Sequence, residues 1–131
     1  MAVIDASVWI ARCREGDAFH EQARHIIQSL LSRQERVSIP AIAFSEVAGA
    51  IKRITKNYDD AREAVLYMKD TEPEVFVDFG KLEPLATEIA INHSLKGADA
   101  YYLAVAKITR SNLYTFDGQQ QEAFDTISKT W

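Results

Sequence analysis

Four acidic residues stand at places where a strand is predicted to end or a helix to begin. Asp5 and Asp117 follow two short apolar runs, whereas Glu46 and Asp99 lie in the first two turns of predicted helices. Carboxylates held close together repel and raise one another's pKa, so such a group is stable near neutral pH only with protons or a metal bound. Oxygen ligands without Cys or His select hard cations, here Mg²⁺ or Mn²⁺, as one or two ions.

Each acid also has an ordinary structural interpretation. Asp is a common helix N-cap, so capping explains Asp5 as well as ligand binding does. The helix dipole favours a carboxylate at a helix N-terminus, which gives Asp99 the same alternative. Without other acids nearby, Glu46 is best explained by a loose pair with Arg53 two turns further on. Ser7 either caps the first helix or orients Asp5, so the argument for chemistry depends on whether the four carboxylates meet.

A repeated order of strands and helices decides where the acids lie. Strands are predicted at residues 3–4, 37–39, 74–79 and 112–117, and helices at 8–14, 18–34, 41–56, 58–70, 82–93, from 99 onward and at 119–124, with 125–131 as an edge strand or a packed tail. Right-handed crossovers place the carboxyl ends of parallel strands at one edge of the sheet, so all four acids are expected there. The predicted fold class is α/β, three-layered, with a central parallel sheet of four to five short strands flanked by helices.

Helical spacing of apolar residues identifies the faces expected to pack inward. In the helices at 18–34 and 41–56 these positions are Phe19, Ala23, Ile26, Ile27, Leu30, Leu31, Ala43, Val47, Ala50, Ile51 and Ile54. Asp17 is expected to cap the helix at 18–34. His20 and His25 are five residues apart, project in different directions and are expected at the surface.

Composition narrows the class of protein. With 131 residues, of which 47% are hydrophobic, we expect one domain over 1–131 that buries a sizeable core. The longest uncharged run is far shorter than a membrane span, and we expect a cytoplasmic protein that does not associate with membranes. A single cysteine, Cys13, excludes an internal disulfide. The net charge of −4 argues against broad adhesion to nucleic acid, but it allows an enzyme that contacts nucleic acid through bound cations.

Four segments together resemble one family. Residues 3–7, 40–47, 98–104 and 113–117 read V-I-D-A-S, P-A-I-A-F-S-E-V, A-D-A-Y-Y-L-A and L-Y-T-F-D. In this order and spacing they resemble the PIN-domain ribonucleases, and within them the VapC-type toxins of toxin-antitoxin pairs. The resemblance places the four acids in one metal-binding catalytic quartet, with Ser7 and Thr115 as supporting residues. Residues 119–122, Gln-Gln-Gln-Glu, depart from the apolar and Gly-containing segment that often precedes a last strand in the family.

The resemblance implies a Mg²⁺-dependent endoribonuclease that hydrolyses RNA phosphodiester bonds and leaves a 3′-hydroxyl and a 5′-phosphate. It also implies a small antitoxin protein as partner. Basic residues that are candidates for RNA contacts are Arg12, Arg14, Lys52, Arg53, Lys56 and Lys96. A candidate surface for the antitoxin or for a homodimer is formed by Tyr58, Leu66, Tyr67 and Met68, which are otherwise core residues.

Two other functions remain as alternatives. One is a catalytically silent interaction module that keeps the fold and only binds a partner. The other is a phosphoacceptor signalling domain, in which Asp78 after the third strand would be phosphorylated. That domain type requires paired acids after the first strand and a Lys after the last, whereas this sequence has Asp5 alone and no Lys beside Thr115.

Overall fold

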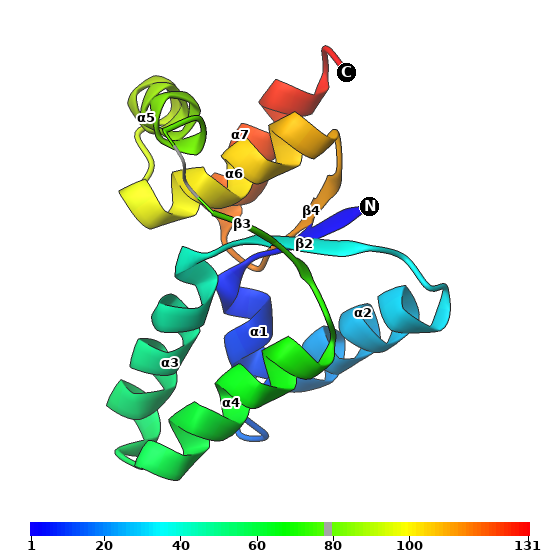
Figure 1. Cartoon of the computed structure of the whole chain (residues 1–131), viewed down its shortest axis with the longest axis vertical. Coiled ribbons are helices and arrows are strands. Elements are labelled where there is room, and N and C mark those ends of the chain that lie inside the picture. The colour runs from blue at the N-terminus through cyan, green and yellow to red at the C-terminus, as the bar shows by residue number, and fades with distance from the viewer. Residues whose placement is uncertain (78–79) are drawn as a thin grey trace.

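A computed structural model describes residues 1–77 and 80–131 (Figure 1). Its centre is a four-stranded parallel sheet with the order β3-β2-β1-β4. The strands are β1 (Ala2–Ile4), β2 (Val37–Pro40), β3 (Glu74–Phe76) and β4 (Asn112–Tyr114). The predicted parallel sheet is therefore confirmed. The third strand ends three residues before the predicted boundary, and Asp78 lies outside the described residues.

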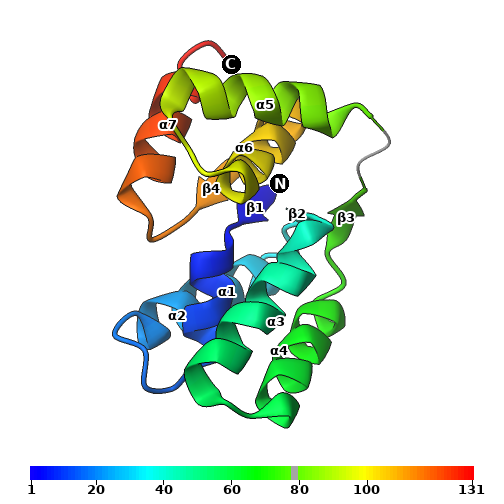
Figure 2. The same ribbon diagram turned by 90° about the vertical axis from the view of Figure 1, so that its left-hand side faces the viewer.

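In the described part of the chain, seven helices cover the two faces of the sheet, which confirms the three-layer α/β class (Figures 1 and 2). One layer contains α1 to α4, and the other contains α5 to α7. Their bounds are α1 Ala6–Arg12, α2 His20–Ser32, α3 Ile42–Thr55, α4 Tyr58–Asp70, α5 Leu82–His93, α6 Gly97–Thr109 and α7 Gly118–Ser128. None of these helices is long and apolar enough to cross a membrane.

Strand β1 lies at the centre of the core because both of its faces are covered. Its three residues are fully buried, as expected for a parallel strand whose sequence is an unbroken apolar run. Trp9 of α1 is also fully buried, and its indole Nε1 donates to the carbonyl of Ile4 at 3.1 Å. Helix α6 contacts β1, β2 and β4 and buries six of its residues, so it is nearly enclosed.

Three residues predicted to face inward are exposed: Phe19, Leu31 and Ile54. Helix α2 begins at His20, so Phe19 precedes the helix and does not follow its apolar face. Leu31 and Ile54 lie in the last turns of α2 and α3, where no further layer covers the helices. Asp17 accepts a hydrogen bond from the Phe19 backbone N–H at 2.8 Å, so it closes the turn before α2 and is not the N-cap.

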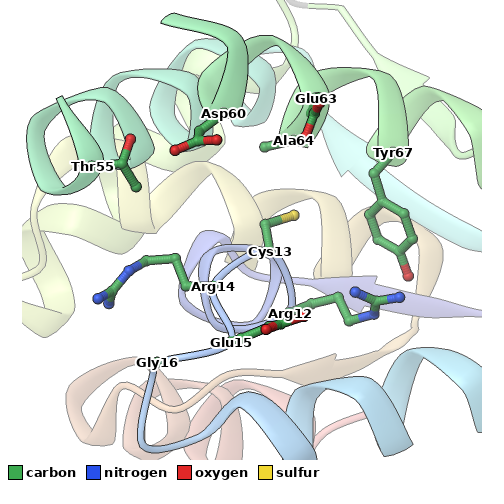
Figure 3. A pocket seen from close by; sticks show the side chains of 10 residues that line it. All are labelled: Arg12, Cys13, Arg14, Glu15, Gly16, Thr55, Asp60, Glu63, Ala64 and Tyr67. Atoms are coloured by element: carbon green, nitrogen blue, oxygen red, sulfur yellow. The ribbon is translucent and has the colours of Figure 1, made fainter. Parts of the chain in front are cut away.

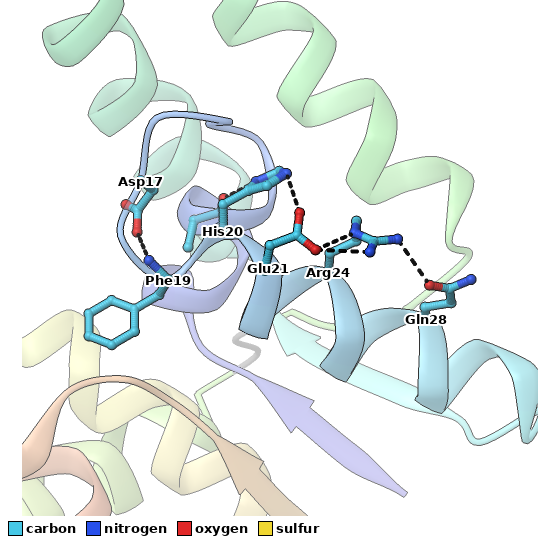
Figure 4. A network of polar contacts seen from close by, with 7 residues as sticks. Asp17, Phe19, His20, Glu21, Arg24 and Gln28 are labelled. Carbon is cyan, nitrogen blue, oxygen red and sulfur yellow. Dashed lines mark hydrogen bonds and ion pairs between the residues drawn. The ribbon is translucent and has the colours of Figure 1, made fainter.

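His20 is half-buried, so its predicted place at the surface is wrong (Figure 4). Its Nδ1 lies 2.9 Å from the carbonyl oxygen of Ala11, near the end of α1. Its Nε2 lies 4.0 Å from Glu21, which also pairs with Arg24 at 2.9 Å. The imidazole therefore joins α1 to the start of α2, whereas His25 is exposed as predicted.

The C-terminal tail forms a helix in place of an edge strand. Helix α7 continues to Ser128, beyond the predicted end at residue 124. Trp131 then packs edge-on against Phe124, with ring centroids 5.5 Å apart. Of the two predicted alternatives, packing of the tail is confirmed.

Candidate active site

Asp5 is buried at the carboxyl end of β1, with 3% of its surface exposed. Its Oδ2 accepts hydrogen bonds from the Ser7 backbone N–H at 3.1 Å, the Ser7 hydroxyl at 2.7 Å and the Thr115 hydroxyl at 3.0 Å. Its Oδ1 accepts from the Gln120 side-chain amide at 3.1 Å. Asp5 therefore caps α1, as one alternative predicted, and is also fixed by side chains from the other end of the chain.

Two hydroxyls connect Asp5 to the segment that follows β4. The hydroxyl of Ser7 accepts from the Phe116 backbone N–H, and the hydroxyl of Thr115 accepts from the Asp117 backbone N–H, both at 3.0 Å. Since each hydroxyl has a single proton and accepts from the backbone, that proton is left for Asp5. The register of the sheet explains why Asp5 contacts the segment after β4. Ile4 pairs with Tyr114, so the residues that follow each strand leave the sheet side by side.

Glu46 is held by a side chain that the sequence did not single out. The hydroxyl of Tyr102, on the buried helix α6, donates to Glu46 Oε1 at 2.6 Å. Burial raises the pKa of Glu46, this hydrogen bond lowers it in part, and the negative charges of Asp5 and Asp99 raise it again. The alternative of a loose pair with Arg53 does not describe this site, since Glu46 faces Tyr102 and the other acids.

Asp99 lies in the first turn of α6 and is half-buried. Burial raises the pKa of Asp99 most strongly, and the negative charge of Asp5 raises it further. A hydrogen bond from Gln120 lowers this pKa, and the negative charge of Asp117 raises it by a smaller amount. Lys96, the residue at which α6 is capped, also lowers the pKa. Asp99 is thus in electrostatic contact with both strand-end acids.

Asp117 has a clear structural role as the N-cap of α7. Its Oδ1 accepts from the backbone N–H groups of Gln119 at 2.8 Å and Gln120 at 3.0 Å. Both of these cap bonds use the same oxygen. Its charge reaches Asp99, so the structure brings Asp117 near this acid while it caps the helix.

The four acids do not form a preassembled metal cage. In residues 1–77 and 80–131, no group of three or more His, Cys, Asp or Glu side chains is arranged to hold a metal ion. The donor set nevertheless fits a hard divalent cation, because it is made of carboxylates whose mutual repulsion and burial a cation would offset. The Oε1 atom of Gln120 is buried without a hydrogen-bond partner among the described residues, so the site also has a free oxygen acceptor.

Sequence reasoning missed Tyr102 and Gln120, and both had a signal in their spacing. Tyr102 follows Asp99 by three residues, which places the two side chains on the same face of α6. Gln120 follows Asp117 by three residues, where a Gln usually reaches back to the N-cap of its own helix. Here it reaches Asp5 instead, which explains why the polar run 119–122 contains one fully buried residue.

Of the basic residues predicted to contact RNA, Lys96 lies beside the acids. Lys52, Arg53 and Lys56 are exposed at the far end of α3, which leads away from Glu46. Arg12 and Arg14 lie at or beyond the end of α1, a helix of 7 residues that spans roughly 10 Å from Asp5. The predicted RNA contacts of these five residues therefore stay predictions, and their positions separate them from the acid cluster.

Arg12 and Arg14 line a cavity of about 400 Å³ between the end of α1 and the α3–α4 pair (Figure 3). The guanidinium of Arg12 lies 4.5 Å from the centre of the Tyr67 ring, and Arg14 pairs with Asp17 at 3.5 Å. Cys13 also lines the cavity, and burial raises the pKa of its thiol to about 11. Cys13 is partly buried, and its thiol is protonated at neutral pH.

Comparison with known proteins decides the family. A family model described as PIN domain matches residues 2–125. The chain belongs to the PIN domain family. Membership supports a nuclease role for this chain, in agreement with the resemblance of its four motifs.

Solved structures agree with this assignment. The chain is similar to the crystal structure of Mycobacterium tuberculosis VapC20, described as a sarcin-ricin loop cleaving toxin, with 25% identity, a TM-score of 0.79, and coverage of 94% of this chain and 95% of that chain. A second structure, PAE2754 from Pyrobaculum aerophilum, shares the fold at 17% identity and a TM-score of 0.69, with 97% of this chain and 85% of that chain covered. A search of curated proteins found no match.

Proposed function

We propose that this PIN domain is an endoribonuclease that requires Mg²⁺ or Mn²⁺ and hydrolyses phosphodiester bonds of RNA, as the toxin of a toxin-antitoxin pair. The observation that carries the proposal is the electrostatic coupling of four carboxylates from distant parts of the chain. Burial and mutual repulsion raise the pKa values of Glu46 and Asp99. Burial and mutual repulsion of Glu46 and Asp99 cost stability, so a function explains their placement better than structure does.

The chain's own residues prepare the site in two ways. Asp5 is fixed in one orientation by Ser7, Thr115 and Gln120 and is shielded from water. Tyr102 fixes Glu46, and burial together with the Glu46 charge raises the pKa of this tyrosine, so it remains a hydrogen-bond donor. A divalent ion bound by the acids would lower the pKa of a water molecule and offset charge on the phosphate. A side-chain nucleophile is therefore unnecessary.

RNA is the proposed substrate because the similar structure of VapC20 is described as a toxin that cleaves the sarcin-ricin loop. Lys96 is positioned to contact a phosphate, since it lies beside Asp99 at the start of α6. A 3′-hydroxyl and a 5′-phosphate are the expected ends of the cut.

A protein partner or a homodimer is proposed on the α3–α4 side of the molecule. Tyr58 and Leu66 are 64% and 52% exposed, whereas Met68 is buried and Tyr67 is half-buried. Tyr58 and Leu66 also line a hollow of about 250 Å³ with Ala48, Ala61 and Val65. The predicted surface is thus reduced to its two exposed members, and the proposed partner is a small antitoxin protein.

The test is cleavage of total cellular RNA by the purified chain, with the ends of the fragments mapped. We expect fragments with 5′-phosphates when Mg²⁺ or Mn²⁺ is present and intact RNA when EDTA is present. Intact RNA under both conditions would contradict the proposal and favour the catalytically silent module. Cleavage that EDTA does not stop would show that the acids do not work through a divalent cation.

A further inference from the structure

Two phenylalanine rings stack beside the acid cluster. Phe19, in the turn before α2, and Phe116, between β4 and α7, have ring centroids 4.7 Å apart and planes inclined by only 17°. Phe19 is 46% exposed, so one face of its ring meets Phe116 while much of the ring remains accessible. Figure 4 shows this ring extending away from α2. The pair is therefore an aromatic surface open to solvent.

This aromatic pair is joined to the catalytic residues through the backbone of Phe116. Its neighbours in the chain are Thr115, which donates to Asp5, and Asp117. The Phe116 N–H donates to the Ser7 hydroxyl, which in turn donates to Asp5. The backbone of Phe116 is therefore held by the same hydrogen-bond network that holds Asp5, while its ring stacks on Phe19.

The second ring is also held in place. The Phe19 backbone N–H donates to Asp17, and Asp17 pairs with Arg14. Next to the pair, Phe116 lines an open hollow of about 570 Å³ with Glu21, Gln22, His25 and Ile26. The hollow has room for a nucleobase, and its polar side chains offer hydrogen-bond donors and acceptors at the edge of the aromatic surface.

We propose that the Phe19–Phe116 pair is a stacking platform for an unpaired nucleobase next to the phosphodiester that is cleaved. Unpaired RNA bases stack on aromatic side chains, and this contact tolerates different bases because every base has a flat π-face. The proposal of a stacking platform rests on the proposed RNA cleavage, and it adds a preference of the protein for single-stranded or looped RNA. RNA is favoured over a protein occupant because Phe116 stands in the chain between Thr115, which donates to Asp5, and Asp117.

The experiment measures cleavage of a short single-stranded RNA that contains a mapped cleavage site, together with versions that each lack one base. For the unmodified protein, we expect removal of one base near the cut to raise KM roughly tenfold, with kcat unchanged. Phe19→Ala is expected to raise KM equally on intact RNA. On the version lacking that base, Phe19→Ala should have no further effect, because the two changes remove the same contact.

Two matched variants distinguish stacking on an aromatic ring from contact with any apolar side chain of similar volume. Phe19→Trp keeps an aromatic ring and should retain the low KM, whereas Phe19→Leu keeps apolar volume and should behave like Phe19→Ala. Since Phe19 is exposed and outside a helix, all three variants are expected to fold, and circular dichroism checks this. Phe116→Leu is the second position to test.

Several outcomes would overturn the platform. If the unmodified protein cleaves RNA and Phe19→Ala has an unchanged KM, the platform is wrong while the proposed nuclease stands. The same holds if Phe19→Ala weakens binding equally for every version lacking a base, or if it changes only self-association in sedimentation, which would assign the rings to a protein contact. If the unmodified protein cleaves no RNA, the proposed function and the platform are both wrong.

Discussion

Asp5 at the N-terminal end of α1 lies near the carboxylates of Glu46 and Asp99, whereas the arginines at the C-terminal end each have a neighbour that stabilises their charge. Arg12 lies over the Tyr67 ring, and Arg14 pairs with Asp17. At the acid end, neutral donors hold Asp5, and burial raises the pKa of Glu46 and of Asp99. Only the acid end therefore carries a charge arrangement that stability alone would not select.

The difference between the two ends of α1 shows which charges cost the fold stability. The cavity at the C-terminal end of α1 is lined by charged side chains of both signs, Arg12, Arg14, Glu15, Asp60 and Glu63, which is common at a protein surface. Repelling carboxylates that the backbone brings together from β1, α3, α6 and the end of β4 are an unusual feature. The predictions below test whether this difference is functional.

The largest effect is expected for Asp99→Asn, which removes a charge from the cluster and keeps the side-chain shape. RNA cleavage should fall by more than about 100-fold, since even changes to residues that only support a metal ligand cost about 10- to 100-fold. Initial rates at saturating Mg²⁺ measure the loss. Asp59→Asn, at an exposed position of α4, is the matched control and should retain full activity. Retained activity of Asp99→Asn would show that the acids at the N-terminal end of α1 are no more important for cleavage than the charges at its C-terminal end.

A smaller loss is expected for Tyr102→Phe, which removes the hydrogen bond to Glu46. Hydrogen bonds to charged groups are worth about 1.5–3 kcal/mol, so cleavage near pH 7 should fall by about tenfold or more. Because this hydrogen bond lowers the pKa of Glu46, its loss should move the acidic limb of the pH–rate profile to higher pH. An unchanged pH profile would show that Glu46 acts independently of Tyr102. Tyr58→Phe, on the exposed part of α4, is the control.

These two predictions show what the sequence could and could not establish. Asp5, Glu46, Asp99 and Asp117 could be proposed from strand ends and helix starts, and the parallel sheet followed from the repeated order of strands and helices. Tyr102 and Gln120 had only a local spacing signal, and their partners Glu46 and Asp5 could not be predicted from it because these lie 56 and 115 residues away in the chain. The exposure of Phe19 was missed for a local reason, since the exact start of α2 depends on the turn closed by Asp17.

Removal of a cluster charge is expected to stabilise the metal-free protein. The folded pKa of Glu46 is raised above its ordinary value of 4.5, so the folded state binds this proton more tightly than the unfolded state. The free energy of unfolding therefore falls as pH rises from 4.5 through the raised pKa, and Asp99 adds a change of the same sign from 3.8 upward. Glu46→Gln should relieve part of this loss near pH 7.

Denaturant unfolding in EDTA measures this effect at both ends of the pH window. The stability gain of Glu46→Gln should be present near pH 7 and absent below the ordinary pKa of Glu. A variant that is less stable than the unmodified protein near pH 7 would show that the Glu46 charge is compensated by other groups.

The smallest effects on cleavage are expected for basic residues, Lys96 beside the acids and Arg12 at the C-terminal end of α1. Lys96→Ala should lower cleavage by roughly twofold to fivefold, because an exposed cation contributes little to binding a charged ligand. The loss should shrink as salt is added. Arg12→Ala should leave cleavage unchanged and lower only the thermal stability, through its contact with Tyr67. A larger loss of cleavage in Arg12→Ala than in Lys96→Ala would place the RNA at the opposite end of the helix.

Calorimetric titration of Mn²⁺ into the metal-free protein tests the central claim most directly, because it asks whether the four carboxylates form one cation site. The account predicts saturable binding with release of protons at mildly acidic pH, since the raised pKa values of Glu46 and Asp99 leave them partly protonated before the ion binds. Asp99→Asn should lose this binding, and Asp59→Asn should keep it. Absence of binding to the unmodified protein, or equal binding to Asp99→Asn, would contradict the account.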